Sequence, residues 1–210
     1  MNESPGAPFE FGVAILGGGR SRRMGQPKLL LPWGDTFVLN HLVRQWQSLN
    51  ARQIAVVVPP DLPSIELALD QIRIRAGDRI LNPDPGRGMF SSVQCAAAWP
   101  GWRSDLTHIV ISLGDQPHVR PSTLAILLAH AAAHSRCICQ PLRAGRWRHP
   151  VVLPRIVLRD LAESIAPDLK SFLSRSTVER SGCEIEDSAL DFDMDTPEEY
   201  ERARRGYFQP

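Results

Sequence analysis

Short continuous apolar runs alternate along the chain with stretches whose apolar residues recur at helical spacing. A continuous apolar run that is bounded by turn residues is typical of a strand buried on both faces. Such runs predict strands at residues 13–16, 54–58, 79–81, 107–113, 136–140 and 151–153. The first run ends in three glycines, and the run at 107–113 stops at Gly114 and Asp115.

Helical spacing marks the segments between these runs. An apolar stripe from Leu39 to Leu49 predicts one helix, with Thr36 available as its N-cap. Further helices are predicted at residues 65–72, 91–98, 121–133 and 155–161, and from Thr196 onward. Pro121 suits the first position of the helix that it opens.

This alternation predicts an α/β fold, a single Rossmann-like three-layer domain whose mostly parallel sheet carries helices on both faces. We assign residues 11–210 to the domain and residues 1–10 to an N-terminal extension, because no linker or repeat divides the rest. Ligands of such sheets bind at the carboxyl ends of the strands. The loop after Leu16, the loop after Leu113 and the segment before Thr196 are therefore the candidate sites.

The charge balance excludes some classes of partner. Lys and Arg number 24 against 23 Asp and Glu, a formal net charge of +1, so we expect no general attraction to nucleic acid or to an anionic membrane. No apolar run approaches the ~18 residues of a membrane span. The first residues lack the order of a signal peptide, and the four cysteines lack zinc spacing. We expect a cytoplasmic protein whose charge-driven chemistry comes from a local cluster.

The loop after the first strand combines glycine with positive charge. Residues 17–19 are glycines, which let backbone N–H groups face an anion such as a polyphosphate. The cations that follow are Arg20, Arg22, Arg23 and Lys28. Five residues separate Gly19 from Gly25 and Gln26 comes next, which excludes a Walker loop. A flexible turn with solvated arginines is the alternative interpretation.

Carboxylates stand at the two remaining candidate sites. Asp115 follows the strand at 107–113, and Mg²⁺ prefers one or two carboxylates together with substrate phosphates. Asp191, Asp193 and Asp195 alternate, so an extended segment would carry them on one side. Turn chemistry also explains Asp115. We assign Asp115 and Asp193 to Mg²⁺ and Asp195 or Thr196 to capping of the last helix, with Asp195 as the alternative second ligand.

A basic glycine loop for a triphosphate, beside carboxylates that hold Mg²⁺, predicts phosphoryl or nucleotidyl transfer. In that chemistry positioning and electrostatics do most of the catalysis. No protein nucleophile is needed, because a phosphate acceptor is already an anion.

Five motifs follow one another in order: LGGGRSRRMGQPK at 16–28, Asn82 with GMFSS at 88–92, LGDQP at 113–117, HPV at 149–151 and DMDTPE at 193–198. Together they resemble the nucleotidyltransferases related to molybdenum-cofactor cytidylyltransferase and guanylyltransferase. The resemblance implies a fold of the nucleotide-diphospho-sugar transferase type. It also implies a reaction in which an acceptor phosphate attacks the α-phosphate of a nucleoside triphosphate and releases pyrophosphate.

The same resemblance implies roles for particular residues. Arg23 and Lys28 match the basic pair that contacts the triphosphate and the transition state, and Asp115 matches the catalytic Mg²⁺ ligand. Contacts to base and phosphates fall on Leu16, Gly17, Gly18, Gly19, Arg20 and Ser21. Asn82, Gly88 and Ser92 would contact the nucleotide, and His149 would orient the acceptor phosphate. Asn82 could instead be a turn residue, Ser92 a helix cap and His149 a structural residue.

The motifs RMGQPK and GDQP, with His149, resemble the cytidylyltransferase branch. CTP is therefore the favoured nucleotide and molybdenum cofactor the expected acceptor, with Mg²⁺ as cofactor and a client molybdoenzyme as a further partner. Gly18 is closer to the guanylyltransferase form, which keeps GTP as an alternative.

Three different functions also stay open from the sequence. The acceptor could be another phosphorylated compound such as a sugar phosphate, or the chain could be a non-catalytic chaperone for molybdenum cofactor. It could also be a dinucleotide-dependent oxidoreductase. Arg22 and the absence of an acidic residue after Val58 argue against the oxidoreductase.

Overall fold

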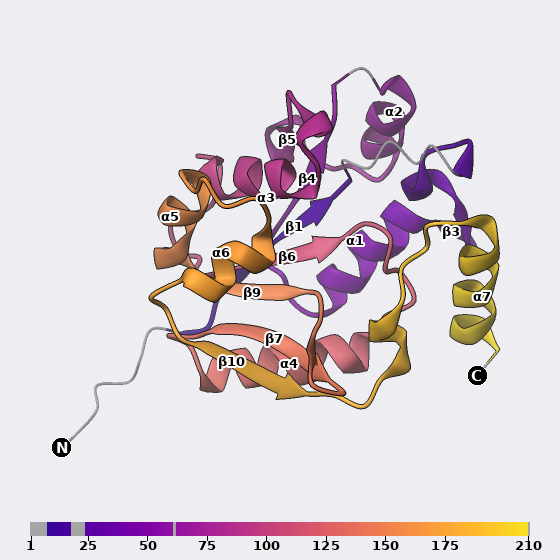
Figure 1. The fold of residues 1–210 in the computed structure, drawn as a ribbon. Helices are drawn as coiled ribbons and strands as arrows, with labels where there is room; N and C mark the ends of the chain where they lie inside the picture. The colour runs from indigo at the N-terminus through magenta and orange to yellow at the C-terminus, as the bar shows by residue number, and fades with distance from the viewer. Residues whose placement is uncertain (1–7, 18–23, 61, 210) are drawn as a thin grey trace.

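The computed structural model describes residues 8–17, 24–60 and 62–209. One large sheet lies between two groups of helices (Figure 1). The strands are β1 (Phe11–Leu16), β4 (Gln53–Val58), β5 (Arg79–Leu81), β6 (His108–Leu113), β7 (Ile138–Arg143), β8 (Arg146–Trp147), β9 (Val151–Pro154) and β10 (Arg180–Glu184). Their order is β10-β7-β9-β6-β1-β4-β5, and β8 pairs with β7. A separate small hairpin joins β2 (Pro32–Trp33) to β3 (Thr36–Phe37).

Parallel pairing dominates this sheet, as the sequence predicts. The central strand β1 pairs in parallel with both β4 and β6, and its last residue Leu16 lies between Val57 and Leu113. β9 runs antiparallel to β6 and β7, and β8 runs antiparallel to β7. The loops after β1 and β6 therefore leave the same edge, and the residues that precede β9 reach that edge from the opposite direction.

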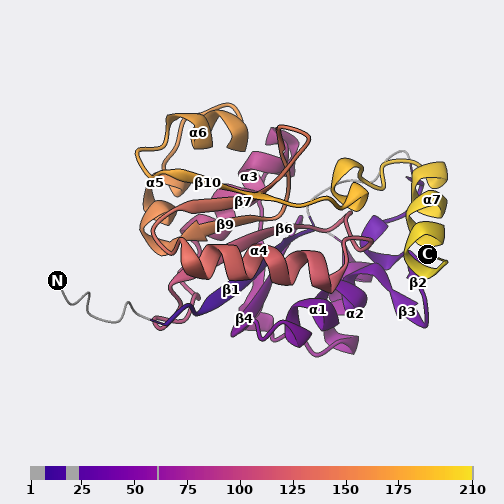
Figure 2. The same cartoon turned by 90° about the horizontal axis from the view of Figure 1, so that it is seen from below.

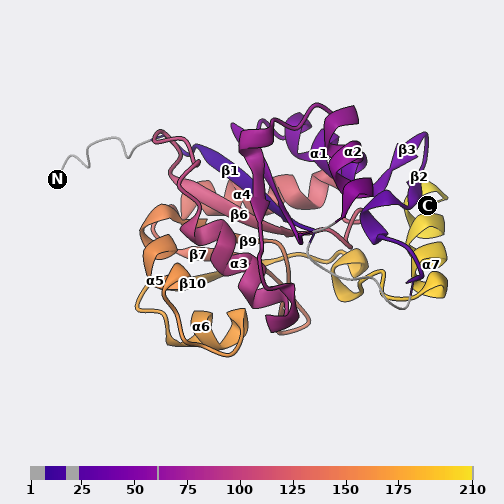
Figure 3. The same ribbon diagram turned by 90° about the horizontal axis from the view of Figure 1, so that it is seen from above.

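The helices are α1 (Val38–Ser48), α2 (Pro63–Gln71), α3 (Met89–Ala98), α4 (Pro121–Ala133), α5 (Leu158–Ala162), α6 (Leu169–Arg175) and α7 (Pro197–Phe208). They cover both faces of the sheet because alternate strand residues point to opposite faces. Val13 and Ile15 of β1 belong to a core that includes α1, α2, α4 and α7, whereas Ala14 and Leu16 belong to a core that includes α3, α5 and α6. Figures 2 and 3 show the two groups of helices on opposite sides of the sheet. Within the described residues, none of the helices has the length and apolarity of a membrane span.

The structure confirms the α/β fold class and adds elements that the apolar pattern did not predict. β10 has one buried residue, Cys183, so its sequence lacks a continuous apolar run. α6 has only seven residues, too few for a clear helical stripe. β7 begins at Ile138 rather than at residue 136 and extends to Arg143.

The prediction of Thr36 as the N-cap of α1 is wrong. Phe37 occupies the N-cap position and Thr36 lies in β3. The Thr36 hydroxyl accepts a hydrogen bond from the Asn40 side chain at 2.7 Å instead. The hydroxyl therefore contacts a side chain in the first turn of α1 and leaves that turn without a side-chain cap.

Candidate active site

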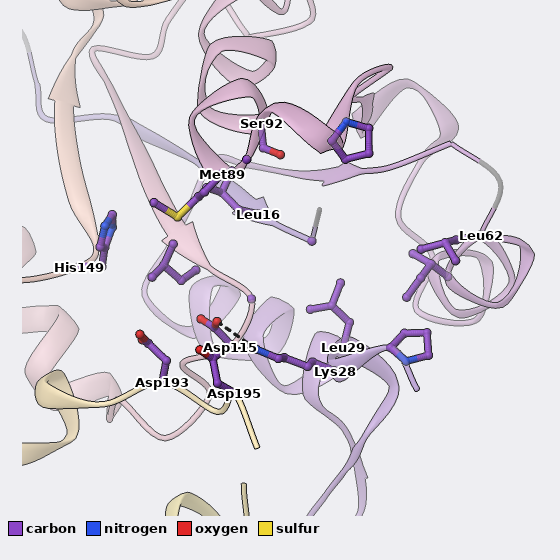
Figure 4. A pocket seen from close by; sticks show the side chains of 17 residues that line it. Leu16, Lys28, Leu29, Leu62, Met89, Ser92, Asp115, His149, Asp193 and Asp195 are labelled. Carbon is purple, nitrogen blue, oxygen red and sulfur yellow. Dashed lines mark hydrogen bonds and ion pairs between the residues drawn. The ribbon is translucent and has the colours of Figure 1, made fainter. Parts of the chain in front are cut away.

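A cleft of about 630 Å³ opens at the carboxyl ends of β1 and β6 (Figure 4). The predicted site residues that line it are Leu16, Gly17, Lys28, Gly88, Ser92, Asp115, His149 and Asp193. Gly18, Gly19, Arg20, Ser21 and Arg23 lie outside the described residues. Segments separated by more than half of the chain thus meet in one cavity, as the motif order led us to expect.

Two glycines allow the strand ends to approach closely enough to form the floor of the cleft. Gly17 donates its backbone N–H to Val57 O at 2.8 Å, and Gly114 donates to Leu16 O at 3.1 Å. A Cβ at Gly17 would lie 2.9 Å from Val57 O, and one at Gly114 would lie 2.6 Å from Leu16 O. Any larger residue would push apart the two loops that carry the site.

Lys28 brings the glycine-loop motif to the carboxylates. Its Nζ lies 2.5 Å from Asp195 Oδ1 and 3.6 Å from Asp115 Oδ2 (Figure 4). The side chain of Lys28 is mostly buried, whereas that of Asp195 is half exposed. Because the Lys28 side chain is mostly buried, solvent screens its charge only weakly. Lys28 therefore supplies a positive charge to which a triphosphate could bind in place of a carboxylate.

Asp115 is a carboxylate whose pKa lies above its ordinary value. Burial, followed by the negative charge of Asp193, raises its pKa to about 6, while Lys28 opposes the shift. Asp115 Oδ1 is buried and has no hydrogen-bond partner among the described residues. A buried carboxylate oxygen without a partner, beside a second carboxylate, suits a divalent cation that takes its remaining ligands from phosphates. The described residues hold no group of three or more His, Cys, Asp or Glu that would bind a metal without such help.

The hydrogen bonds at the N-terminus of α7 show which residue caps the helix. Thr196 Oγ1 accepts from the backbone N–H of Glu199, and Glu199 Oε2 accepts from the backbone N–H groups of Thr196 and Asp195, which forms a complete capping box. Asp195 is therefore not the cap, and its side chain pairs with Lys28. From the sequence, Asp195 was a candidate for both capping and metal binding, and its ion pair with Lys28 was not predicted. The Thr-x-x-Glu spacing, which assigns the cap to Thr196, is the signal that could have separated the two roles.

His149 lies two residues before β9, on the far side of the cleft from Lys28 (Figure 4). Burial lowers its pKa to about 4, although the charge of Asp193 opposes the shift. Its Nδ1 is buried without a hydrogen-bond partner among the described residues. The lowered pKa keeps the ring neutral at physiological pH.

Asn82 is a predicted contact residue that does not line the cleft. It is 1% exposed, and its Nδ2 donates to Ser91 Oγ at 2.8 Å and to Ser92 Oγ at 2.9 Å. Asn82 thereby fixes the start of α3 behind the loop that carries Gly88. Gly88 has φ +88°, a conformation that favours glycine, and no atom lies within 4 Å of where its Cβ would be. The loop therefore presents backbone to the cleft.

Part of the cleft lining is apolar and was not predicted as part of the site. It is formed by Leu29, Leu62, Ile65, Met89 and Leu113. Leu29 and Ile65 are also core residues, so their positions in the sequence look like ordinary packing. The cleft thus combines charged residues, which suit phosphates, with apolar residues, which suit a planar organic group.

Comparison with known proteins identifies relatives over almost the whole chain. A family model described as MobA-like NTP transferase domain matches residues 13–180. A molybdenum cofactor cytidylyltransferase from Escherichia coli (strain K12) is 26% identical over 194 residues, which cover 92% of this chain and 95% of that protein. A molybdenum cofactor guanylyltransferase from Rhizobium johnstonii is 29% identical over 202 residues, which cover 91% of this chain and 90% of that protein. Among solved structures, Rv0371c from Mycobacterium tuberculosis H37Rv matches with a TM-score of 0.76 and 25% identity, covering 94% of this chain and 98% of that one.

Proposed function

The chain belongs to the MobA-like NTP transferase family and is a nucleotidyltransferase that resembles the molybdenum cofactor cytidylyltransferases and guanylyltransferases, and from this premise we propose that it transfers CMP from CTP to molybdenum cofactor. The observation that carries the proposal is the convergence of Lys28 with Asp115, Asp193 and Asp195 in one cleft. The motifs RMGQPK and GDQP support CTP over GTP.

The reaction forms one bond and breaks one. An oxygen of the terminal phosphate of molybdenum cofactor attacks the α-phosphorus of CTP, and the bond from that phosphorus to the bridging oxygen of pyrophosphate breaks. The electron pair of the broken bond leaves with pyrophosphate. Lys28 binds the triphosphate and neutralises charge as it accumulates on the leaving group.

Asp115 and Asp193 are the residues that would hold Mg²⁺. The partnerless oxygen of Asp115 and the raised pKa of its carboxyl fit a site completed by a cation. When bound, Mg²⁺ neutralises phosphate charge and orients the phosphates. Asp195 is engaged by Lys28, which favours Asp193 as the second ligand.

In this proposal His149 orients the acceptor. A neutral imidazole nitrogen without a partner among the described residues, across the cleft from Lys28, is suited to a hydrogen bond with the acceptor phosphate. Apolar lining residues such as Leu62 and Met89 would contact the planar part of a ligand.

The test is a panel of CTP, GTP, ATP and UTP, each with Mg²⁺ and molybdenum cofactor, in which pyrophosphate is measured and the product mass determined. We expect pyrophosphate with CTP and a cytosine dinucleotide product. Pyrophosphate with GTP alone would contradict the choice of nucleotide, and turnover only with a sugar phosphate would contradict the acceptor. No pyrophosphate with any nucleotide, together with tight binding of molybdenum cofactor, would establish the chaperone instead.

A further inference from the structure

The acidic segment that carries Asp193 has little regular structure to hold it. Residues 192–195 lie between a short 3-10 helix (Ser188–Asp191) and α7 and belong to neither. Asp193 itself is exposed. An exposed carboxylate on irregular backbone rotates freely, and binding a cation would then cost side-chain entropy. Something else must fix this group if it is to act as a ligand.

The backbone on both sides of Asp193 is anchored to the loop after β6. His118 Nε2 lies 3.0 Å from Phe192 O and 3.1 Å from Ala189 O, and its ring stacks on that of Phe192 with a centroid distance of 4.5 Å. On the other side, the buried residue Met194 donates its backbone N–H to Asp115 O at 3.3 Å. These contacts place the Cα of Asp193 but leave its carboxylate free to turn.

Gln116 makes the contact that orients the carboxylate. Its Nε2 donates to Asp193 Oδ1 at 2.8 Å. Gln116 is 9% exposed and sits between Asp115 and Pro117, so the donor comes from a buried side chain on the loop that supplies the first carboxylate. Two side chains of α1 contact the backbone of the same loop. Gln45 Nε2 donates to Val119 O at 2.6 Å, and His41 Nε2 lies 3.1 Å from Pro117 O.

We infer that Gln116 is a positioning residue for the metal site: it holds one oxygen of Asp193 so that the other is presented to a divalent cation beside Asp115. This inference rests on the proposed function, in which Asp115 and Asp193 bind Mg²⁺. Residues that orient metal ligands in this way typically contribute about 10- to 100-fold to metal affinity. The amide also reduces the repulsion between the two carboxylates, because its N–H faces the negative charge.

The test measures Mn²⁺ binding by electron paramagnetic resonance of the free ion, with the chain and saturating CTP but no acceptor, and CTP alone gives the background that is subtracted. Gln116→Met keeps nearly the same volume and removes the donor. We expect Mn²⁺ to bind about 10-fold or more weakly to this variant, and the Mg²⁺ concentration needed for half-maximal activity to rise while kcat at saturating Mg²⁺ changes little. Gln94→Met is the matched control, because Gln94 donates to Ala162 O and Ser164 O outside the cleft; its Mn²⁺ affinity should equal that of the wild type.

The remaining outcomes separate the inference from the proposed function. Mn²⁺ affinity unchanged in Gln116→Met but lost in Asp193→Asn would overturn the role of Gln116 and leave the metal site intact. Affinity unchanged in both variants would overturn this inference and the assignment of Asp193, whereas pyrophosphate release by the wild type tests the reaction itself. If Gln116→Met does not fold, Gln116→Asn replaces it, because the shorter amide retreats from Asp193 and should weaken Mn²⁺ binding in the same direction.

Discussion

Lys28 is the residue on which the charge balance of the cleft depends. Its ammonium group faces Asp195 and Asp115, and the charge of Asp193 also acts on Asp115. Sequence reasoning predicted the basic character of the loop and the carboxylate after β6, because each follows directly from a strand end. It did not predict the partner of Lys28, because the Asp195 side chain reaches the cleft only once Thr196 has taken the cap.

We predict that Lys28→Ala weakens binding of nucleoside triphosphate by at least about 10-fold, because a charge-assisted contact to phosphate is worth about 1.5–3 kcal/mol. The chain has only one other lysine, Lys170, which is exposed on α6. Lys170→Ala is therefore the matched control and should bind nucleotide normally. Titration calorimetry with CTP decides the question, and equal affinity in the two variants would place the triphosphate elsewhere.

We predict that replacing the Asp115 carboxylate lowers activity without lowering stability. Asp115→Asn should lower kcat by at least about 100-fold, a loss typical of removing one electrostatic group from a transition state. Its melting temperature without divalent cation should equal or exceed that of the wild type, because the substitution removes a buried charge that Asp193 opposes. Calorimetric melting and pyrophosphate release test both halves. A variant that keeps its activity, or one that is clearly destabilised, would contradict the assignment.

At the scale of elements, rules that use only neighbouring residues predict the N-cap of one helix correctly and that of another wrongly. The Thr-x-x-Glu pattern before α7 forms its capping box, since both partners lie within one turn. Thr36 fails as a cap of α1 because the β2–β3 hairpin, whose pairing depends on residues on both sides of a turn, holds it in a strand. β10 was missed for a similar reason: its place beside β7 is a property of the assembled sheet, and its polar sequence carries no strand pattern.

Loss of the capping box should destabilise the protein measurably. Thr196→Ala removes the side-chain acceptor for the Glu199 N–H and should cost about 0.5–2 kcal/mol of unfolding free energy, or roughly 2–4 °C of melting temperature per kcal/mol. Thr36→Ala is the control, because that hydroxyl receives a side-chain hydrogen bond from Asn40 and caps no helix. Chemical denaturation of both variants provides the comparison. A larger loss for Thr36→Ala than for Thr196→Ala would refute this account of α7.

At the scale of the whole molecule, the sheet has a core on each face, and histidines are buried beside it. The sequence predicted the two-faced sheet because its strands are apolar on both faces. The sequence assigned no role to His108. In the structure its side chain is 3% exposed, and its Nε2 lies 2.9 Å from Ser135 O, so its burial makes stability depend on pH. Burial lowers its pKa below the ordinary value, partly offset by the hydrogen bond to Ser135.

The difference between the pKa of His108 in the folded state and in the unfolded state makes the free energy of unfolding depend on pH. The unfolded chain protonates His108 near pH ~6.5, before the folded protein does. The stability that the neutral ring contributes is therefore present above that pH and is lost as the pH falls toward the lower pKa of the folded state. We predict that unfolding free energy falls between about pH 7.5 and pH 5.5, and that His108→Gln reduces this fall by up to about 1 kcal/mol. Urea denaturation at both pH values measures the difference, and identical pH dependence in the two proteins would exclude His108 as a contributor.

The reversed direction of β9 has a consequence for how this cleft diversifies. Lys28 and Asp115 follow β1 and β6, whereas His149 lies between the β7–β8 hairpin and β9. Substitutions or insertions in residues 143–149 can thus reshape one half of the cleft without disturbing the parallel strands that hold the other half. Changes in this segment would also reach the acidic residues near the cleft, because Arg143 and Arg148 both pair with Asp191, two residues before Asp193.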